Sequence, residues 1–127
     1  MKLLHNTNIP LFSQIANIIE EQILDGTFKE NDQIMSTNEL SSYFKINPNT
    51  VLKGVNLLVD ERILYKKRGI GMFVSEEAQI IIMKKRNLEF KDEVLNAVVN
   101  EAKKLQIDED TLIQMIKVMY KREDKND

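Results

Sequence analysis

Cysteine is absent from this sequence, and histidine occurs once, at His5. Without cysteine the chain can form no disulfide, no thiolate metal site and no cysteine nucleophile. A single histidine leaves no basis for a histidine metal cluster or a Ser-His-Asp triad. The few glycines form no phosphate-cradling loop. We therefore expect no catalytic residue, no metal site and no cofactor, and an enzyme is the weakest interpretation.

Long apolar runs and a signal segment are also lacking. The densest apolar run covers residues 80–83, far fewer than the roughly 20 residues that cross a bilayer. The N-terminus has no cationic stretch followed by an apolar one. We expect a cytoplasmic protein with no membrane partner.

The net charge of −2 is distributed unevenly. Residues 1–44 carry 2 cations and 6 anions, a net −4, and residues 76–127 carry 10 and 12, a net −2. Residues 45–75 carry 6 cations and 2 anions, a net +4. A basic middle segment favours a nucleic-acid partner, while the acidic total predicts weak non-specific DNA binding.

The stretch after Ile46 predicts the start of a helix. Asn47 suits the N-cap, and Pro48 suits the first helical position. Apolar residues then follow at the spacing of one buried face: Val51, Val55 and Leu58. The other face offers groups that contact phosphates and base edges: Asn49, Thr50 and Lys53. Taken alone, this pattern fits a DNA-reading helix and an ordinary polar surface helix equally well.

Two further helices should precede it. Residues 11–23 carry an apolar stripe, with Pro10 in the first turn and a stop near Gly26. Ser36 and Glu39 form the capping-box signature of a second helix of about two turns. Two short helices joined so tightly predict a helix-turn-helix, whose second helix enters the DNA major groove.

A hairpin should follow these helices. Residues 63–65 and 72–74 are typical of strands, and the connection contains Gly69 and Gly71. Three cations lead into its tip: Lys66, Lys67 and Arg68. After a helix-turn-helix, such a hairpin predicts a wing that follows the DNA backbone or enters the minor groove. The alternative is a solvated hairpin whose lysines protect a sheet edge.

The last part of the chain predicts a helical hairpin after a helical lead-out from Ile80, with Asp108 as N-cap between its two helices. We favour pairing with a second subunit over packing on the chain's own winged helix. The residues expected to pair are Val94, Leu95, Val98, Leu105, Leu112, Ile116, Met119 and Tyr120. A small-molecule effector pocket is a less favoured alternative, with candidate lining residues Met83, Met115 and Met119.

From Pro10 to Val74, an ordered set of motifs resembles the GntR family of bacterial transcription regulators. The motifs include Pro10-Leu11-Phe12, Ser36-Thr37-Asn38-Glu39-Leu40, Asn47-Pro48-Asn49-Thr50-Val51 and Arg68-Gly69-Ile70-Gly71-Met72-Phe73-Val74. The Asn-Pro-Asn-Thr-Val version and the short tail look most like the YtrA branch. That branch resembles a winged helix followed by a small helical dimerisation region.

The resemblance implies a mainly α fold with a small β-hairpin: a winged helix-turn-helix domain over residues 1–75 and a dimerisation region over residues 76–127. It implies a sequence-specific regulator, a homodimeric repressor on an inverted-repeat operator with half-sites about one helical turn, ~34 Å, or a multiple apart. A winged-helix module for a protein partner is the alternative.

The resemblance also places the DNA contacts, at Ser36, Thr37, Asn38, Asn49, Thr50, Lys53, Arg68, Gly69 and Gly71. Asn47 and Lys67 complete the predicted DNA-binding set. The sequence departs from the family where Glu30-Asn31-Asp32 replaces the usual Pro-Gly. Arginine is common where Asn38 and Lys53 stand, and lysine keeps the charge without the bidentate geometry.

Overall fold

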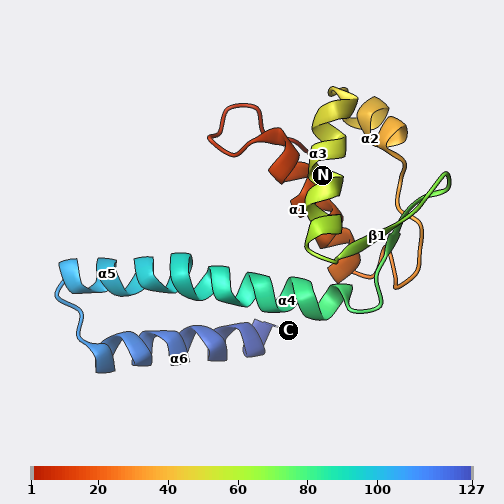
Figure 1. Cartoon of the computed structure of the whole chain (residues 1–127). Helices are drawn as coiled ribbons and strands as arrows, with labels where there is room; N and C mark the ends of the chain where they lie inside the picture. Colours follow the sequence, from red (N-terminus) through yellow and green to blue (C-terminus); the bar gives the residue numbers. More distant parts are fainter. Residues whose placement is uncertain (1, 127) are drawn as a thin grey trace. The chain divides into compact units, whose positions relative to one another are not determined.

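The computed structural model describes residues 2–126, and the chain divides into two compact units after Lys85. The first unit holds α1 (Leu11–Leu24), α2 (Thr37–Phe44), α3 (Pro48–Asp60), β1 (Leu64–Lys67), β2 (Gly71–Val74) and the start of α4 (Ala78–Glu89). The second holds the rest of α4, the π-helical segment η1 (Phe90–Leu95), α5 (Asn96–Lys104) and α6 (Glu109–Asn126). The mainly α fold with one small hairpin is confirmed (Figure 1).

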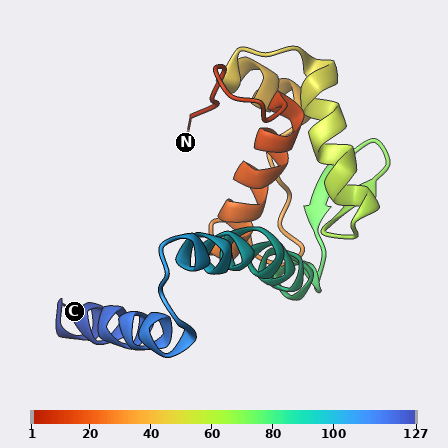
Figure 2. The ribbon, with the colours of Figure 1, turned by 90° about the vertical axis from the view of Figure 1, so that its left-hand side faces the viewer.

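Helices α1 and α3 lie side by side and form the core of the first unit (Figure 2). Their apolar stripes are fully buried, as the sequence predicts: Ile15, Ile19 and Ile23 from α1 and Val51, Val55 and Leu58 from α3. Gly54 allows the close approach, because a Cβ there would lie 2.6 Å from the backbone oxygen of Phe12. Pro10 is the N-cap of α1 and not part of its first turn.

Helix α2 begins with the predicted capping box. The backbone N–H of Glu39 donates to Ser36 Oγ at 3.0 Å, and the backbone N–H of Ser36 donates to Glu39 Oε1 at 3.0 Å. Lys45 is the C-cap of the helix, and its φ of 56° lies in the left-handed region. Ser41 Oγ then donates to the backbone oxygen of Ile46 at 2.6 Å. These bonds fix the turn between α2 and α3.

The hairpin is antiparallel, with Leu64 paired to Val74 and Lys67 paired to Gly71. Each strand has four residues where three were expected: Ile63 precedes β1, Lys66 and Lys67 belong to β1 and not to the connection, and Gly71 belongs to β2. Residues 32–34 lie along β2, since Gln33 forms an isolated bridge with Phe73 and the N–H of Ile34 donates to the Met72 oxygen at 3.0 Å. The polar residues before this segment form a turn, in which the N–H of Asp32 donates to the Lys29 oxygen at 3.0 Å, but the pairing with β2 was not predicted.

The first turns of α4 are anchored in the first unit, where Ala78 and Ile82 are buried. Lys85 Nζ donates to the buried carboxylate of Glu20, at 2.5 Å, and to Glu61 Oε2, at 2.9 Å. Burial lowers the pKa of Lys85, but the hydrogen bonds to Glu20 and Glu61 outweigh it and hold that pKa above its ordinary value. One ammonium therefore ties α4 to α1 and to the end of α3.

The tail differs from the expected lead-out followed by a separate helix. Helix α4 starts at Ala78 and passes through the π-helical segment η1 into α5 without a break. Helix α6 then runs back in the opposite direction (Figure 1). Asp108 accepts the N–H of Thr111 at 2.8 Å, as expected of an N-cap. No helix among residues 2–126 is long and apolar enough to cross a membrane.

Candidate nucleic-acid interface

The first turn of α2 holds three predicted DNA contacts, Ser36, Thr37 and Asn38. Ser36 is engaged in the capping box, Thr37 is half-buried and Asn38 is exposed. The backbone hydrogen bond from Ser36 lowers the pKa of Glu39, which keeps this carboxylate charged at the helix start. Of the three side chains, Asn38 is therefore the most accessible to a ligand.

The first turn of α3 holds Asn47, Asn49 and Thr50. Asn47 Oδ1 accepts the N–H of Asn49 at 2.8 Å, so its side chain caps the helix. Asn49 is exposed and Thr50 is half-buried. Asn47 thus orients the helix start, and Asn49 projects from it.

Lys53 lies one turn further along α3, with Nζ 4.2 Å from the centre of the Phe12 ring. Such a cation–π contact orients the side chain while its N–H donors stay available, because the ring attracts the charge through its face. The local pattern around Lys53 could not reveal Phe12, which lies on α1.

The exposed face of α3 is larger than the sequence suggested. A hollow of about 460 Å³ is lined by Phe12, Asn49, Leu52, Lys53, Asn56, Leu57 and Asp60. Leu52 and Asn56 were not among the predicted contacts, although both fall on the helical spacing that starts at Asn49. That periodicity could have identified them.

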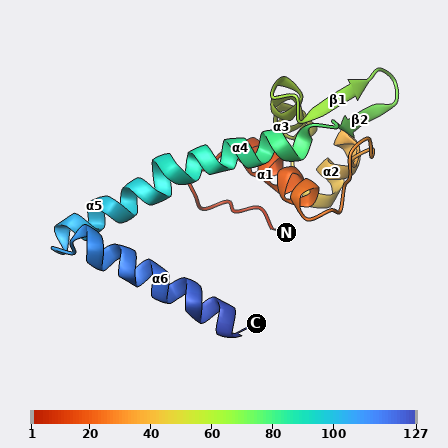
Figure 3. The same cartoon turned by 90° about the horizontal axis from the view of Figure 1, so that it is seen from below.

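The predicted wing is a hairpin that projects from the helices (Figure 3). Tyr65 and Phe73 stack at 5.7 Å between ring centres, and Lys67 Nζ lies 4.5 Å from the centre of the Phe73 ring. Gly69 has a φ of 78°, the left-handed value that the third position of a type II turn requires. At the tip, Gln33 Nε2 donates to the backbone oxygen of Ile70 at 3.0 Å.

Cations dominate the exposed surface of the helix-turn-helix and the hairpin. Six are exposed, namely Lys45, Lys53, Arg62, Lys66, Lys67 and Arg68. Two anions are exposed on these elements, Glu39 in the first turn of α2 and Asp60 at the far end of α3, whereas Glu61 is paired with Lys85. The predicted cations of the helix-turn-helix and of the hairpin therefore belong to one compact unit. Gly69 and Gly71, both with positive φ, shape the tip of the hairpin.

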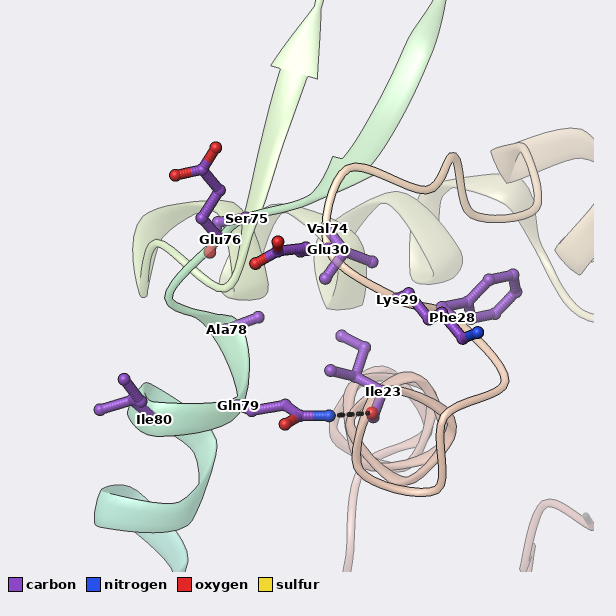
Figure 4. A pocket seen from close by; sticks show the side chains of 10 residues that line it. All are labelled: Ile23, Phe28, Lys29, Glu30, Val74, Ser75, Glu76, Ala78, Gln79 and Ile80. Carbon is purple, nitrogen blue, oxygen red and sulfur yellow. Dashed lines mark hydrogen bonds between the residues drawn. The ribbon is translucent and has the colours of Figure 1, made fainter.

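A second cavity of the first unit, about 330 Å³, lies where the end of α1 meets the start of α4 (Figure 4). Ile23, Val74 and Ala78 supply apolar walls, and Gln79 Nε2 donates to the Ile23 oxygen at 3.2 Å. None of the predicted DNA contacts lines this cavity, so it is separate from the candidate interface.

The predicted dimerisation residues all lie on the second unit. Leu112 is half-buried and the other seven are exposed, from Ile116 at 38% to Tyr120 at 72%. Further exposed apolar residues that were not predicted lie beside them: Phe90, Val99, Ile113 and Val118.

Residues 11–74 match the family described as "Bacterial regulatory proteins, gntR family". The chain belongs to the GntR family. The HTH-type transcriptional repressor YtrA of Bacillus subtilis (strain 168) is 29% identical to this GntR protein over 94 residues, which are 74% of this chain and 72% of YtrA.

Solved structures agree with this membership. A GntR-family transcriptional regulator from Bacteroides thetaiotaomicron matches with a TM-score of 0.77 and 29% identity, over 88% of this chain and 97% of that one. The DNA-binding domain of AraR in complex with operator ORE1 matches with a TM-score of 0.53 and 29% identity, over 57% of this chain and 89% of that one. This GntR protein is a DNA-binding transcription regulator and not an enzyme.

Proposed function

We propose that this GntR regulator is a homodimeric repressor that acts in the cytoplasm on an inverted-repeat operator. Each subunit places α3 in a major groove and its hairpin along the adjacent backbone or minor groove. Two-fold symmetry sets the half-sites about one helical turn, ~34 Å, or a multiple apart. The similarity to YtrA, a transcriptional repressor, supports the direction of regulation.

The main observation that supports this surface as the DNA contact is the placement of two lysines against aromatic rings. Lys53 lies over Phe12 and Lys67 over Phe73. Both ammonium groups are therefore partly ordered before any ligand arrives, which lowers the entropy lost when they bind phosphate or a base. The AraR domain bound to its operator supports duplex DNA as the ligand.

The tail supports a dimer because its apolar residues cover more than one side of α6. Ile113, Met115, Ile116, Val118 and Met119 are all at least 38% exposed. An apolar surface wider than one helix face is normally buried, and one neighbouring helix can cover only part of it. A second subunit would cover the remainder, and the hollow of about 320 Å³ along Met115 and Met119 fits that role better than an effector pocket.

Selection of bound duplexes from a random pool, followed by titration at several salt concentrations, tests the DNA-binding proposal. We expect an inverted repeat and an affinity that falls steeply with salt, because phosphate contacts release counterions. Lys53→Ala should weaken operator binding by ~1–3 kcal/mol if Lys53 contacts a base. An equal loss on random duplexes would assign Lys53 to phosphate, and a flat salt dependence would favour a protein partner.

The dimer is tested by placing a charge on the apolar tail. Ile116→Glu should yield single subunits in sedimentation and weaken operator binding by about 10²-fold or more, since the second half-site contact is lost. Gln114→Glu adds the same charge at an exposed polar position of α6 and should leave the dimer intact. A single subunit in the unaltered protein at working concentrations would contradict the proposal.

A further inference from the structure

Leu52 is an exposed leucine on the face of α3 that otherwise carries polar groups. Its side chain is 39% exposed and lines the hollow together with Asn49, Lys53 and Asn56. The four residues fall at i, i+3, i+4 and i+7, so they form one stripe along the helix. The stripe covers about 10 Å at 1.5 Å per residue, which is roughly three base-pair steps of about 3.4 Å.

The amides on either side of Leu52 are suited to reading base edges. Within residues 2–126, no protein group hydrogen-bonds to the side chain of Asn49 or Asn56. An asparagine side chain binds adenine through N6 and N7 in the major groove. Lys53 adds a positive charge held over Phe12 at the edge of the same stripe.

Leu52 itself offers only hydrocarbon, which restricts what it can recognise. Among the groups that base pairs expose in the major groove, the one apolar group is the C5 methyl of thymine. An apolar contact between two adenine-reading amides matches a run of A·T pairs, whereas a leucine facing a cytosine amino group would leave that donor without a partner.

We propose that Leu52 determines specificity by packing against the C5 methyl group of a thymine in each operator half-site. Asn49 or Asn56 binds adenine in an adjacent pair. This inference rests on the proposed placement of α3 in the major groove, and it adds a base-specific contact that is independent of the charge of the surface.

Deoxyuridine substitution tests the contact, because it removes only the methyl group. In the selected operator, thymines are replaced one position at a time, symmetrically in both half-sites. We expect one position at which the full-length protein binds about fourfold more weakly per half-site, the loss typical of one buried methyl group. Leu52→Ala should weaken binding to the thymine operator and should show no further loss at that position.

Leu57→Ala is the matched control, because Leu57 lines the same hollow and is 37% exposed. Recognition helices contact bases with the residues near their start, and Leu57 lies further along α3. The Leu57→Ala variant should therefore retain the full deoxyuridine effect. Far-UV circular dichroism should show both variants folded. A protein that binds its operator but tolerates every deoxyuridine, or a Leu52→Ala variant that keeps the effect, overturns this inference alone. Failure to select any duplex from the random pool overturns the proposed function as well.

Discussion

The two units of this regulator differ in how completely each buries its own apolar residues. In the first unit, the stripes of α1 and α3 close on each other and on the hairpin, and Ile15, Val51 and Leu58 have no exposed surface. In the second unit, Ala102 is the one buried residue among those whose side chains are described, up to Arg122. The winged helix is therefore complete within one chain, while α5 and α6 leave most of their apolar residues exposed.

An amphipathic helix can bury its apolar stripe within its own chain or against another chain, and the two units differ in this respect. An apolar stripe that meets a partner in its own chain stabilises the fold, and the polar face opposite is left for DNA. An apolar stripe without such a partner stabilises the protein only when another chain covers it. Substitutions in the two units should therefore respond differently to protein concentration.

The largest effect is expected from Leu58→Ala, which opens a cavity in the core of the first unit. We expect a loss of about 3 kcal/mol in the free energy of unfolding, typical of a fully buried leucine. Urea titrations should give the same loss at low and high protein concentration. Ile116→Ala, in the tail, should instead show a loss that depends on concentration, and a concentration-independent loss would remove the contrast between the units.

Lys85→Met should cost nearly as much, about 3 kcal/mol, because the buried carboxylate of Glu20 loses the ammonium that faces it. Adding Glu20→Gln should recover much of that loss, which a double-mutant cycle measures. If Glu20→Gln made the Lys85→Met protein still less stable, the ammonium would not be the group that compensates this carboxylate.

The same ammonium predicts a pH dependence. The pKa of Lys85 is raised in the folded state above its ordinary value of 10.5. Its contribution is therefore complete below pH 10.5 and is lost as pH rises through the folded pKa. The stability difference between the unaltered protein and Lys85→Met should stay constant from pH 7 to 9 and narrow in more alkaline solution.

Gly54→Ala should have a smaller effect, about 1–2 kcal/mol. The added Cβ would meet the Phe12 backbone oxygen at 2.6 Å, so α1 and α3 must move apart, while alanine returns up to about 1 kcal/mol of helix propensity. Thermal unfolding measures the net loss. Gly26→Ala is the control for backbone strain, because nothing lies within 4 Å of its Cβ position but its φ is 87°. A gain in stability for Gly54→Ala would mean that the helix contact is loose.

The smallest effect concerns the capping box. The pKa of Glu39 is lowered by the backbone hydrogen bond from Ser36, so its contribution is present above pH 4.5 and fades as pH falls through the folded pKa. Glu39→Gln can keep the cap without titrating. Its melting temperature should therefore fall less between pH 7 and 3 than that of the unaltered protein, and equal falls would contradict the assignment.

The features that could be predicted from the sequence are those that neighbouring residues create. The capping box at Ser36, the proline at the start of α3 and the glycine turn at Gly69 each depend on contacts within a few residues, and each is present. The contacts that orient the interface join distant residues, as in Phe12 with Lys53 and Gln33 with Ile70. Because these partners lie far apart in the sequence, the spacing of residues within one helix or strand cannot reveal the contacts.

The tail was harder to predict. The lead-out and the next helix were expected as separate elements, but α4 continues through the π-helical segment η1 into α5. The Leu52 position was missed because a leucine among polar residues was not considered as a DNA contact, although the spacing from Asn49 placed it on the exposed face.

The stoichiometry of the operator complex tests the central claim, that each chain forms a complete winged helix but needs a second chain to cover its apolar tail. Native mass spectrometry of the protein with its selected duplex should show two chains on each inverted repeat. The Ile116→Glu variant should form complexes that contain one chain. A stable complex of one unaltered chain with the full operator would contradict it.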